Sequence, residues 1–241
     1  MTARPAPRRV PRLLVLALAT AAALAACGGT PSASPAPSAT AAPGSPSPSV
    51  APGSGGPATS ATPFPTGSFT FDLPAGWKAI PLDGSHDALL AAFRAQNPTF
   101  ADSLEARIKA LPGTATYLAV NASPAVVAKG DVVTLIVTEV NLPADVSSET
   151  FAKTVQSQVK QLVEDDVPLK PVLLSSGQGY SMAYSAPFTR PDGQQATVAV
   201  TQVLYVIPGR GYVMTFSAPQ SRAQDYAQEI ADIATSFTIK L

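Results

Sequence analysis

The sequence contains few of the side chains from which active sites and metal centres are usually built. Its 241 residues include one cysteine, Cys27, and one histidine, His86. A lone cysteine excludes an intramolecular disulfide, and zinc sites draw most of their ligands from cysteine and histidine. The chain also lacks a Gly-x-Ser-x-Gly nucleophile motif, a phosphate-binding loop and a dinucleotide-binding glycine pattern. We therefore expect no catalytic residues, no metal and no cofactor, and a protein that is not an enzyme.

Apolar runs long enough to cross a bilayer are also absent. The N-terminal run from Leu13 to Ala26 is short of the roughly 20 residues that a spanning helix needs, and no later segment reaches that length. Four arginines lie before this run, and a basic start followed by a short apolar stretch is typical of a signal peptide. We expect residues 1–26 to be removed from the mature protein.

The motif Leu24-Ala25-Ala26-Cys27 resembles the lipobox of bacterial prolipoproteins. The resemblance implies a diacylglyceryl group on the Cys27 thiol and cleavage before this residue. Two or more acyl chains such as palmitate, at about 0.8 kcal/mol per buried methylene, hold a soluble domain on a membrane for long times. We expect a lipoprotein anchored in the cell membrane on its extracytoplasmic face. The alternative is an incidental cysteine in an apolar leader.

Charged residues are missing between Gly28 and Phe71, and residues 28–67 are almost entirely Pro, Ala, Ser, Gly and Thr, with ten prolines. Such a segment cannot bury enough apolar surface to fold. After the lipidated Cys27, we expect residues 28–67 to be a disordered spacer that reaches between about 35 Å as a flexible coil and about 120 Å when extended. A proline-motif docking site or a glycosylated stalk is the alternative.

The charge balance argues against a nucleic-acid partner. Without the four arginines of residues 1–26, 12 basic residues remain against 16 acidic ones, a net charge of −4. Proteins that bind nucleic acids usually carry a basic patch and a net positive charge. We therefore expect the mature chain to bind partners other than DNA or RNA.

Residues 68–241 differ abruptly in composition from the spacer and are long enough for one domain with a sizeable core. Polar and apolar residues alternate on both sides of the turn Leu73-Pro74-Ala75-Gly76. This pattern predicts a strand, a turn and a second strand that begins at Trp77. A tryptophan in this position is expected to pack in the core.

The middle of the domain is expected to contain both helices and strands. Ser85 can cap a first helix that runs to about Gln96, and Asn97-Pro98 begins a second one. The apolar, β-branched residues 132–140 are typical of a strand inside a sheet whose two faces are both covered. The other expected elements are a strand at 116–121 and a helix from Ser148 with Phe151, Val155, Val159 and Leu162 on its apolar face.

The C-terminal part is predicted to be a meander of antiparallel strands followed by a helix. Turns at Pro191-Asp192-Gly193 and at Pro208-Gly209-Arg210-Gly211 separate strand-like segments, which favours hairpins. The final helix is expected from about Ser221, with Ala223, Tyr226, Ile230, Ile233 and Phe237 on its apolar face. Together these elements predict the α+β class: a largely antiparallel sheet with helices on both faces, an α/β/α sandwich.

Two segments resemble the PsbP-like superfamily. Residues 69–77 resemble its opening strand, Leu-Pro-x-Gly-Trp turn and second strand, and residues 212–219 with the last helix and Ser236-Phe237 resemble its closing half. The chain is similar in particular to the LpqN-type lipoproteins of actinobacteria, which join a lipobox and a low-complexity stretch to this domain.

This resemblance implies a PsbP-like fold and a non-enzymatic role. The superfamily includes an extrinsic photosystem II subunit and a Ran-binding protein, and LpqN-like members are linked to cell-envelope lipid transport partners. Residues 83–170 depart most from the family pattern, so the resemblance names no partner for this chain.

Two sequence clusters suggest chemistry at first sight. Ser85-His86-Asp87 has the composition of a catalytic triad, but a triad is assembled across the fold and adjacent residues point in different directions. Glu164-Asp165-Asp166 is the densest acidic cluster, and it lacks the spacing of a calcium loop. We interpret the first as a helix start and the second as a solvated turn.

Two functions follow from these observations. The first is an interaction or accessory module that binds an envelope transporter or enzyme. The second is a carrier of an acyl or glycolipid ligand in a pocket between the sheet and a helix. Tyr180, Met182 and Tyr184, with Tyr205 and Tyr212 nearby, are candidates for lining such a pocket, although core packing is the interpretation we favour.

Overall fold

The computed structural model describes residues 68–163, 166–190 and 192–240. The expected signal peptide, the lipidated Cys27 and the spacer of residues 28–67 lie outside these residues, so they stay predictions. Within the described ranges, no helix is both long enough and apolar enough to cross a membrane.

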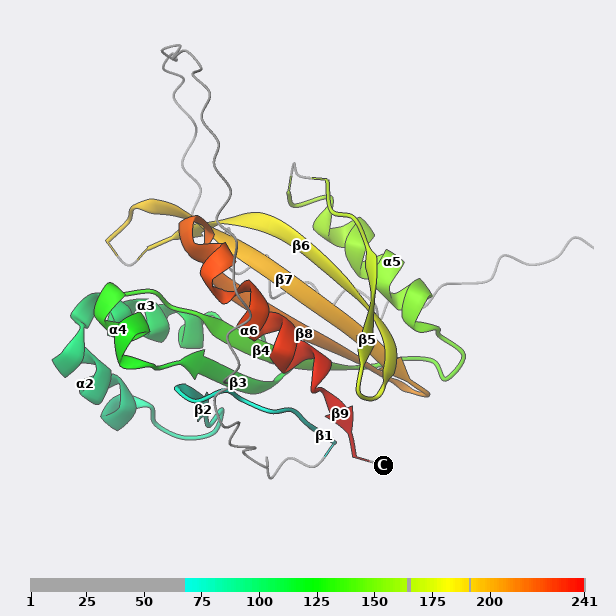
Figure 1. The fold of residues 1–241 in the computed structure, drawn as a ribbon, viewed down its shortest axis with the longest axis horizontal. Helices are drawn as coiled ribbons and strands as arrows, with labels where there is room; N and C mark the ends of the chain where they lie inside the picture. Colours follow the sequence, from blue (N-terminus) through cyan, green and yellow to red (C-terminus); the bar gives the residue numbers. More distant parts are fainter. Residues whose placement is uncertain (1–67, 164–165, 191, 241) are drawn as a thin grey trace, which may run out of the picture.

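A seven-stranded antiparallel sheet forms the centre of the domain (Figure 1). The strands are β2 (Trp77–Ile80), β3 (Ala115–Asn121), β4 (Thr134–Asn141), β5 (Lys170–Leu174), β6 (Gly177–Thr189), β7 (Gln195–Ile207) and β8 (Arg210–Pro219). They lie side by side in the order β2-β3-β4-β8-β7-β6-β5. The predicted meander is confirmed, because β5 to β8 pair consecutively, and β4 is confirmed as an interior strand between β3 and β8.

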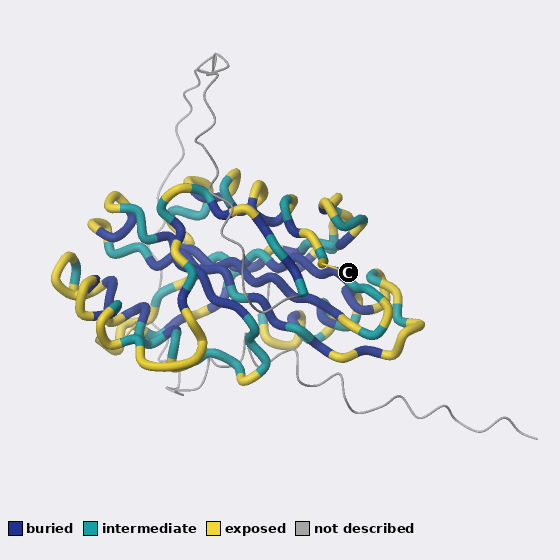
Figure 2. The backbone as a smooth tube through the Cα atoms, turned by 90° about the horizontal axis from the view of Figure 1, so that it is seen from below, coloured by how far each residue is buried: buried dark blue, intermediate teal, exposed yellow. Residues whose placement is uncertain are grey.

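Helices lie on both faces of this sheet. They are α2 (Asp87–Gln96), α3 (Pro98–Lys109), α4 (Pro124–Lys129), α5 (Ser148–Val159) and α6 (Ala223–Thr235), and the short 3-10 helix η2 (Gln220–Arg222) precedes α6. Figure 2 shows the strands as the buried interior, with exposed positions along the outer sides of the helices. The cap predicted at Asn97 is confirmed, because its side chain accepts a hydrogen bond from the backbone N–H of Phe100.

Strand β8 shows which helix covers which face. Met214 and Phe216 pack in the core cluster that contains the apolar residues of α6, whereas Val213 packs with those of α5. Arg107 of α3 donates a hydrogen bond to Ser217, whose side chain points to the same face as Val213. Helices α3 and α5 therefore share one face, and α6 crosses the other (Figure 1). The predicted α+β class, with a largely antiparallel sheet in an α/β/α sandwich, is confirmed.

The two ends of the domain are joined by a small second sheet. Strands β1 (Phe69–Thr70) and β9 (Thr238–Ile239) pair antiparallel. Beside them the ring of Phe237 lies 5.6 Å from that of Phe69 and 5.7 Å from that of Tyr212, between centroids. The predicted opening strands both form, but β1 pairs with β9 and not with β2.

The prediction that Phe237 lies on the final helix is wrong. Helix α6 ends at Thr235, and Phe237 follows it with its side chain fully buried among the aromatic rings. The apolar spacing of α6 continues in the sequence beyond the last helical turn. A segment that leaves the helix and enters the core can have the same spacing, so the pattern does not show where the helix ends. The prediction also missed β9, which has only two residues.

Three other expectations are corrected. Leu162 is 44% exposed, because α5 ends at Val159 and the chain turns before it can reach the sheet. The first helix begins at Asp87, although the Ser85 hydroxyl does accept the Asp87 backbone N–H at 3.2 Å. The missed helix α4 begins at Pro124 and ends at Lys129, and Gly130 follows it with a φ of +74°, the left-handed conformation favoured by glycine.

Candidate functional site

Helix α6 covers only part of its face of the sheet, and an open groove lies beside it. This α6 groove has a volume of about 670 Å³ and runs between α6 and strands β5, β6 and β7. Its sheet wall includes Ala183, Ala199 and Thr201, and its helix wall includes Ala227 and Ala231. Ligand sites in proteins usually have volumes of about 300–1,000 Å³, so the groove is large enough to hold a ligand or a partner segment.

Short side chains on α6 explain why the groove is not filled. The larger apolar residues of the helix, Tyr226, Ile230 and Ile233, are buried against the sheet. Ala227 and Ala231 lie one helical turn apart on the groove side and are exposed. Residues of this size cannot reach the outer strands, so the sheet surface of β6 and β7 stays accessible.

The groove is nearly uncharged along its lining. Its polar groups include Ser181, Ser185, Thr201 and Gln220, and the Ser185 hydroxyl donates a hydrogen bond to the Gln220 side chain at 3.3 Å. Asp166 is the only charged residue among the described lining residues. Such a surface suits an apolar or neutral occupant with a few hydrogen-bonding groups.

The first turn of α6 is held in place by an ion-pair cluster. Arg222 contacts the Asp131 carboxylate at 2.9 Å and the Asp225 carboxylate at 2.6 Å. The Tyr226 hydroxyl donates to Asp131 at 3.0 Å. Burial, and then the hydrogen bond to Asp131, raise the pKa of Tyr226 to about 12, so this hydroxyl stays protonated and keeps donating at neutral pH.

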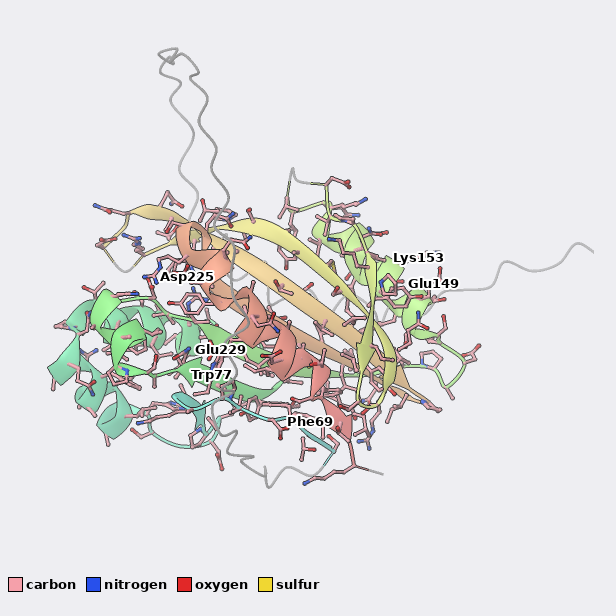
Figure 3. All side chains as sticks on the ribbon, viewed as in Figure 1. Phe69, Trp77, Glu149, Lys153, Asp225 and Glu229 are labelled. Carbon is pink, nitrogen blue, oxygen red and sulfur yellow. The ribbon has the colours of Figure 1, made fainter. Side chains whose placement is uncertain are left out.

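The middle of α6 is held by a second polar contact. The Asn121 amide of β3 donates to the Glu229 carboxylate at 3.1 Å. Asn121 is paired in register with Trp77 of β2, and Figure 3 shows Glu229 and Trp77 close together at this end of the sheet. Trp77 is 7% exposed, which confirms its predicted place in the core. The groove wall formed by α6 is therefore attached at two points.

The sequence triad Ser85-His86-Asp87 makes only local contacts. The Ser85 hydroxyl donates to the Asp87 carboxylate at 2.7 Å, and His86 Nε2 lies 2.5 Å from the carbonyl oxygen of Pro81. His86 therefore bonds to the backbone, and its ring is not placed between the serine and the aspartate as a catalytic base requires. The three residues make local contacts at the start of α2.

Two of the three residues of the predicted acidic cluster, Glu164 and Asp165, lie outside the described residues. Asp166 is exposed and lies 3.6 Å from the Lys160 ammonium group. Among the residues that the structure describes, no three His, Cys, Asp or Glu side chains lie close enough to hold a metal ion together.

The tyrosines proposed to line one pocket lie on opposite faces of the sheet. Met182 and Tyr184 are buried on the α5 side, whereas Tyr205 and Tyr212 pack on the α6 side. The burial of Met182, Tyr184, Tyr205 and Tyr212 confirms the core interpretation for these four, and Tyr180 is half-buried. Tyr184 also borders the α6 groove, and the spacing of Ala223, Ala227 and Ala231 is the sequence signal that could have indicated its helix wall.

Comparison with known proteins finds distant likenesses in structure. No protein-family model matches the chain, and no curated protein matches it in sequence. LpqN of Mycobacterium tuberculosis, described as involved in cell envelope biogenesis, is 16% identical, with 73% of this chain and 86% of that chain covered and a TM-score of 0.42.

Two further solved structures show a likeness of the same order. The Ran-binding protein Mog1p of Saccharomyces cerevisiae is 13% identical over 76% of this chain and 96% of its own, with a TM-score of 0.42. Cyanobacterial PsbP from Synechocystis is 10% identical over 80% of this chain and 98% of its own, with a TM-score of 0.39. Values this low transfer neither an activity nor a partner, and the LpqN-type assignment stays a prediction.

Proposed function

We propose that this chain is a non-enzymatic binding module, anchored by lipid on Cys27 at the extracytoplasmic face of the cell membrane, which receives a segment of an envelope protein in the α6 groove. The observation that supports this most is the groove itself, which is open along one side of α6 and lined by short side chains. The lipid anchor and the spacer of residues 28–67 would let such a module search the space near the membrane.

The openness of the groove favours a protein segment over a lipid chain. Small-molecule sites bury about 70–90% of their ligand, and an acyl chain in an open groove would leave much of its apolar surface in water. A peptide segment tolerates solvent on one side, and groups such as Thr201 and Gln220 can bond to its backbone. An acyl or glycolipid chain is the second candidate, favoured by the near absence of charge in the lining.

An Ala231→Trp substitution tests this proposal, because it fills the groove from an exposed helix position without touching the core. We expect capture of envelope partners by the full-length chain, measured by crosslinking in cells, to fall by about tenfold or more, which is the loss of one interface hot spot. Gln228→Trp is the matched control, since Gln228 is exposed on α6 outside the groove lining.

Two results would contradict the partner proposal. One is equal crosslinking by the Ala231→Trp and wild-type chains, and the other is wild-type crosslinking no greater than that of an anchor and spacer without the domain. Native mass spectrometry of the same preparations distinguishes the second candidate, an acyl or glycolipid ligand, from a protein segment. Lipid retained by the wild-type chain and lost from Ala231→Trp would assign the groove to an acyl ligand.

A further inference from the structure

Arg107 on α3 is a buried cation without an acidic partner. Its side chain points to the sheet and is 9% exposed. Arginines are almost never buried to this degree unless a carboxylate pairs with them. Among the described residues, none of the ion pairs involves Arg107.

The contacts of Arg107 leave part of its hydrogen-bonding capacity unused. Nη1 donates to the Ser217 hydroxyl at 2.5 Å, and the guanidinium carbon lies 5.0 Å from the centre of the Phe188 ring. Nε has no acceptor in the described part of the chain. Burial lowers the pKa of Arg107 to about 10, so the group still carries its charge at neutral pH.

A pocket of about 290 Å³ opens beside this guanidinium, on the face of the sheet opposite the α6 groove. Ser103 and Thr99 of α3 supply hydroxyl groups to its wall, and Lys129 and Arg190 add two more cations. Neither Lys129 nor Arg190 forms an ion pair with another described residue.

The one acid in the lining of this pocket already has hydrogen-bond partners outside it. Asp131 accepts hydrogen bonds from Arg222 at 2.9 Å and from Tyr226 at 3.0 Å. The pocket is lined by three cations and this one acid, so its described lining carries a net positive charge. A small volume with a buried guanidinium and hydroxyl donors matches one anionic oxygen group, because arginine binds carboxylates and phosphates through its planar fork.

We propose that this Arg107 pocket binds the carboxylate or phosphate group of a small ligand, with Arg107 and Ser103 as contacts and with Lys129 and Arg190 attracting the anion at the mouth. The site is separate from the α6 groove, so it stands or falls independently of the proposed function. The bound anion would supply the counter-charge that Arg107 lacks.

The test is calorimetric titration of the full-length chain with inorganic phosphate and, separately, with acetate. We expect the wild type to bind one of these with a dissociation constant of about 1 mM or lower. Arg107→Met should weaken binding at least about tenfold, because it removes the charge-assisted hydrogen bonds. The same anion should raise the melting temperature of the wild type and leave that of Arg107→Met unchanged.

A second variant keeps the test decisive if Arg107→Met does not fold. Thr99→Trp fills the pocket from an exposed position at the start of α3 and leaves Arg107 in place, and Gln194→Trp, exposed and outside the lining, is its control. Binding lost in Thr99→Trp and kept in Gln194→Trp supports the site. A third probe, short-chain phosphatidic acid, distinguishes a lipid headgroup from free phosphate. If the pocket recognises a lipid headgroup, this probe should bind more tightly than phosphate alone. The proposal is overturned if none of the three probes binds the wild type, or if both pocket variants bind as the wild type does.

Discussion

A Cys27→Ser variant is expected to leave the membrane fraction almost completely and to appear as a soluble chain. The serine hydroxyl cannot accept the diacylglyceryl group that the lipobox resemblance implies for the thiol. Without acyl chains, each buried methylene of which contributes about 0.8 kcal/mol, the chain would lose the anchor that we expect to hold it on the bilayer.

Fractionation of cells followed by immunoblotting measures this effect. Ser34→Ala, which changes the spacer and leaves the lipobox intact, is the matched control and should stay with the membranes. Mass spectrometry of the wild-type N-terminal peptide should find a chain that starts at Cys27 and carries the lipid mass. A Cys27→Ser chain that stays membrane-bound would show that something else attaches the protein.

A Phe237→Ala substitution is expected to lower the free energy of unfolding by about 3–5 kcal/mol. The Phe237 side chain is fully buried, and its ring packs against those of Phe69, Tyr205 and Tyr212. Removing it leaves a cavity where β1 and β9 join the two ends of the domain. A loss of this size is a large share of the 5–15 kcal/mol that typically stabilises a domain.

Chemical denaturation measures the change, with Leu173→Ala as the control. Leu173 is 76% exposed on the edge strand β5, so its truncation should alter the free energy of unfolding by less than about 0.5 kcal/mol. If the two variants were destabilised equally, the aromatic cluster would not be the contact that holds the domain ends together.

The sheet was the most predictable part of the fold. The apolar, β-branched residues 132–140 predicted the interior strand β4, and the Pro-Gly turns placed the hairpins. These features depend on local backbone preference and on burial of whole strands. Elements of few residues, such as β9 and α4, were missed because a short segment carries too little periodicity to stand out.

The α6 groove was not predictable from local pattern alone. It depends on where α6 crosses the sheet, and the packing of Tyr226, Ile230 and Ile233 determines that position. The apolar stripe predicted for α6 does not say how much of the sheet the helix covers. The alanines beside that stripe show that the helix leaves the outer strands uncovered, and this becomes visible only when helix and sheet are placed together.

Arg107 was also missed, although its position carried a clue. It lies three residues after Leu104 and seven after Phe100, on the apolar side of the helix. A charged residue at such a position in sequence is usually read as the edge of the polar face, because long side chains often reach solvent. Only the packing of α3 against β8 shows that the Arg107 side chain does not reach solvent.

The central claim is that the α6 groove is where the chain meets its partner, and photocrosslinking from inside the groove tests it most directly. A photoreactive amino acid at Ala183 on the sheet wall, and the same amino acid at Gln228 on the outer side of α6, are introduced into the full-length anchored chain. After irradiation of cells, we predict a discrete crosslinked protein from position 183 and none of it from position 228. Crosslinks to that protein from position 228 with none from position 183 would contradict the account.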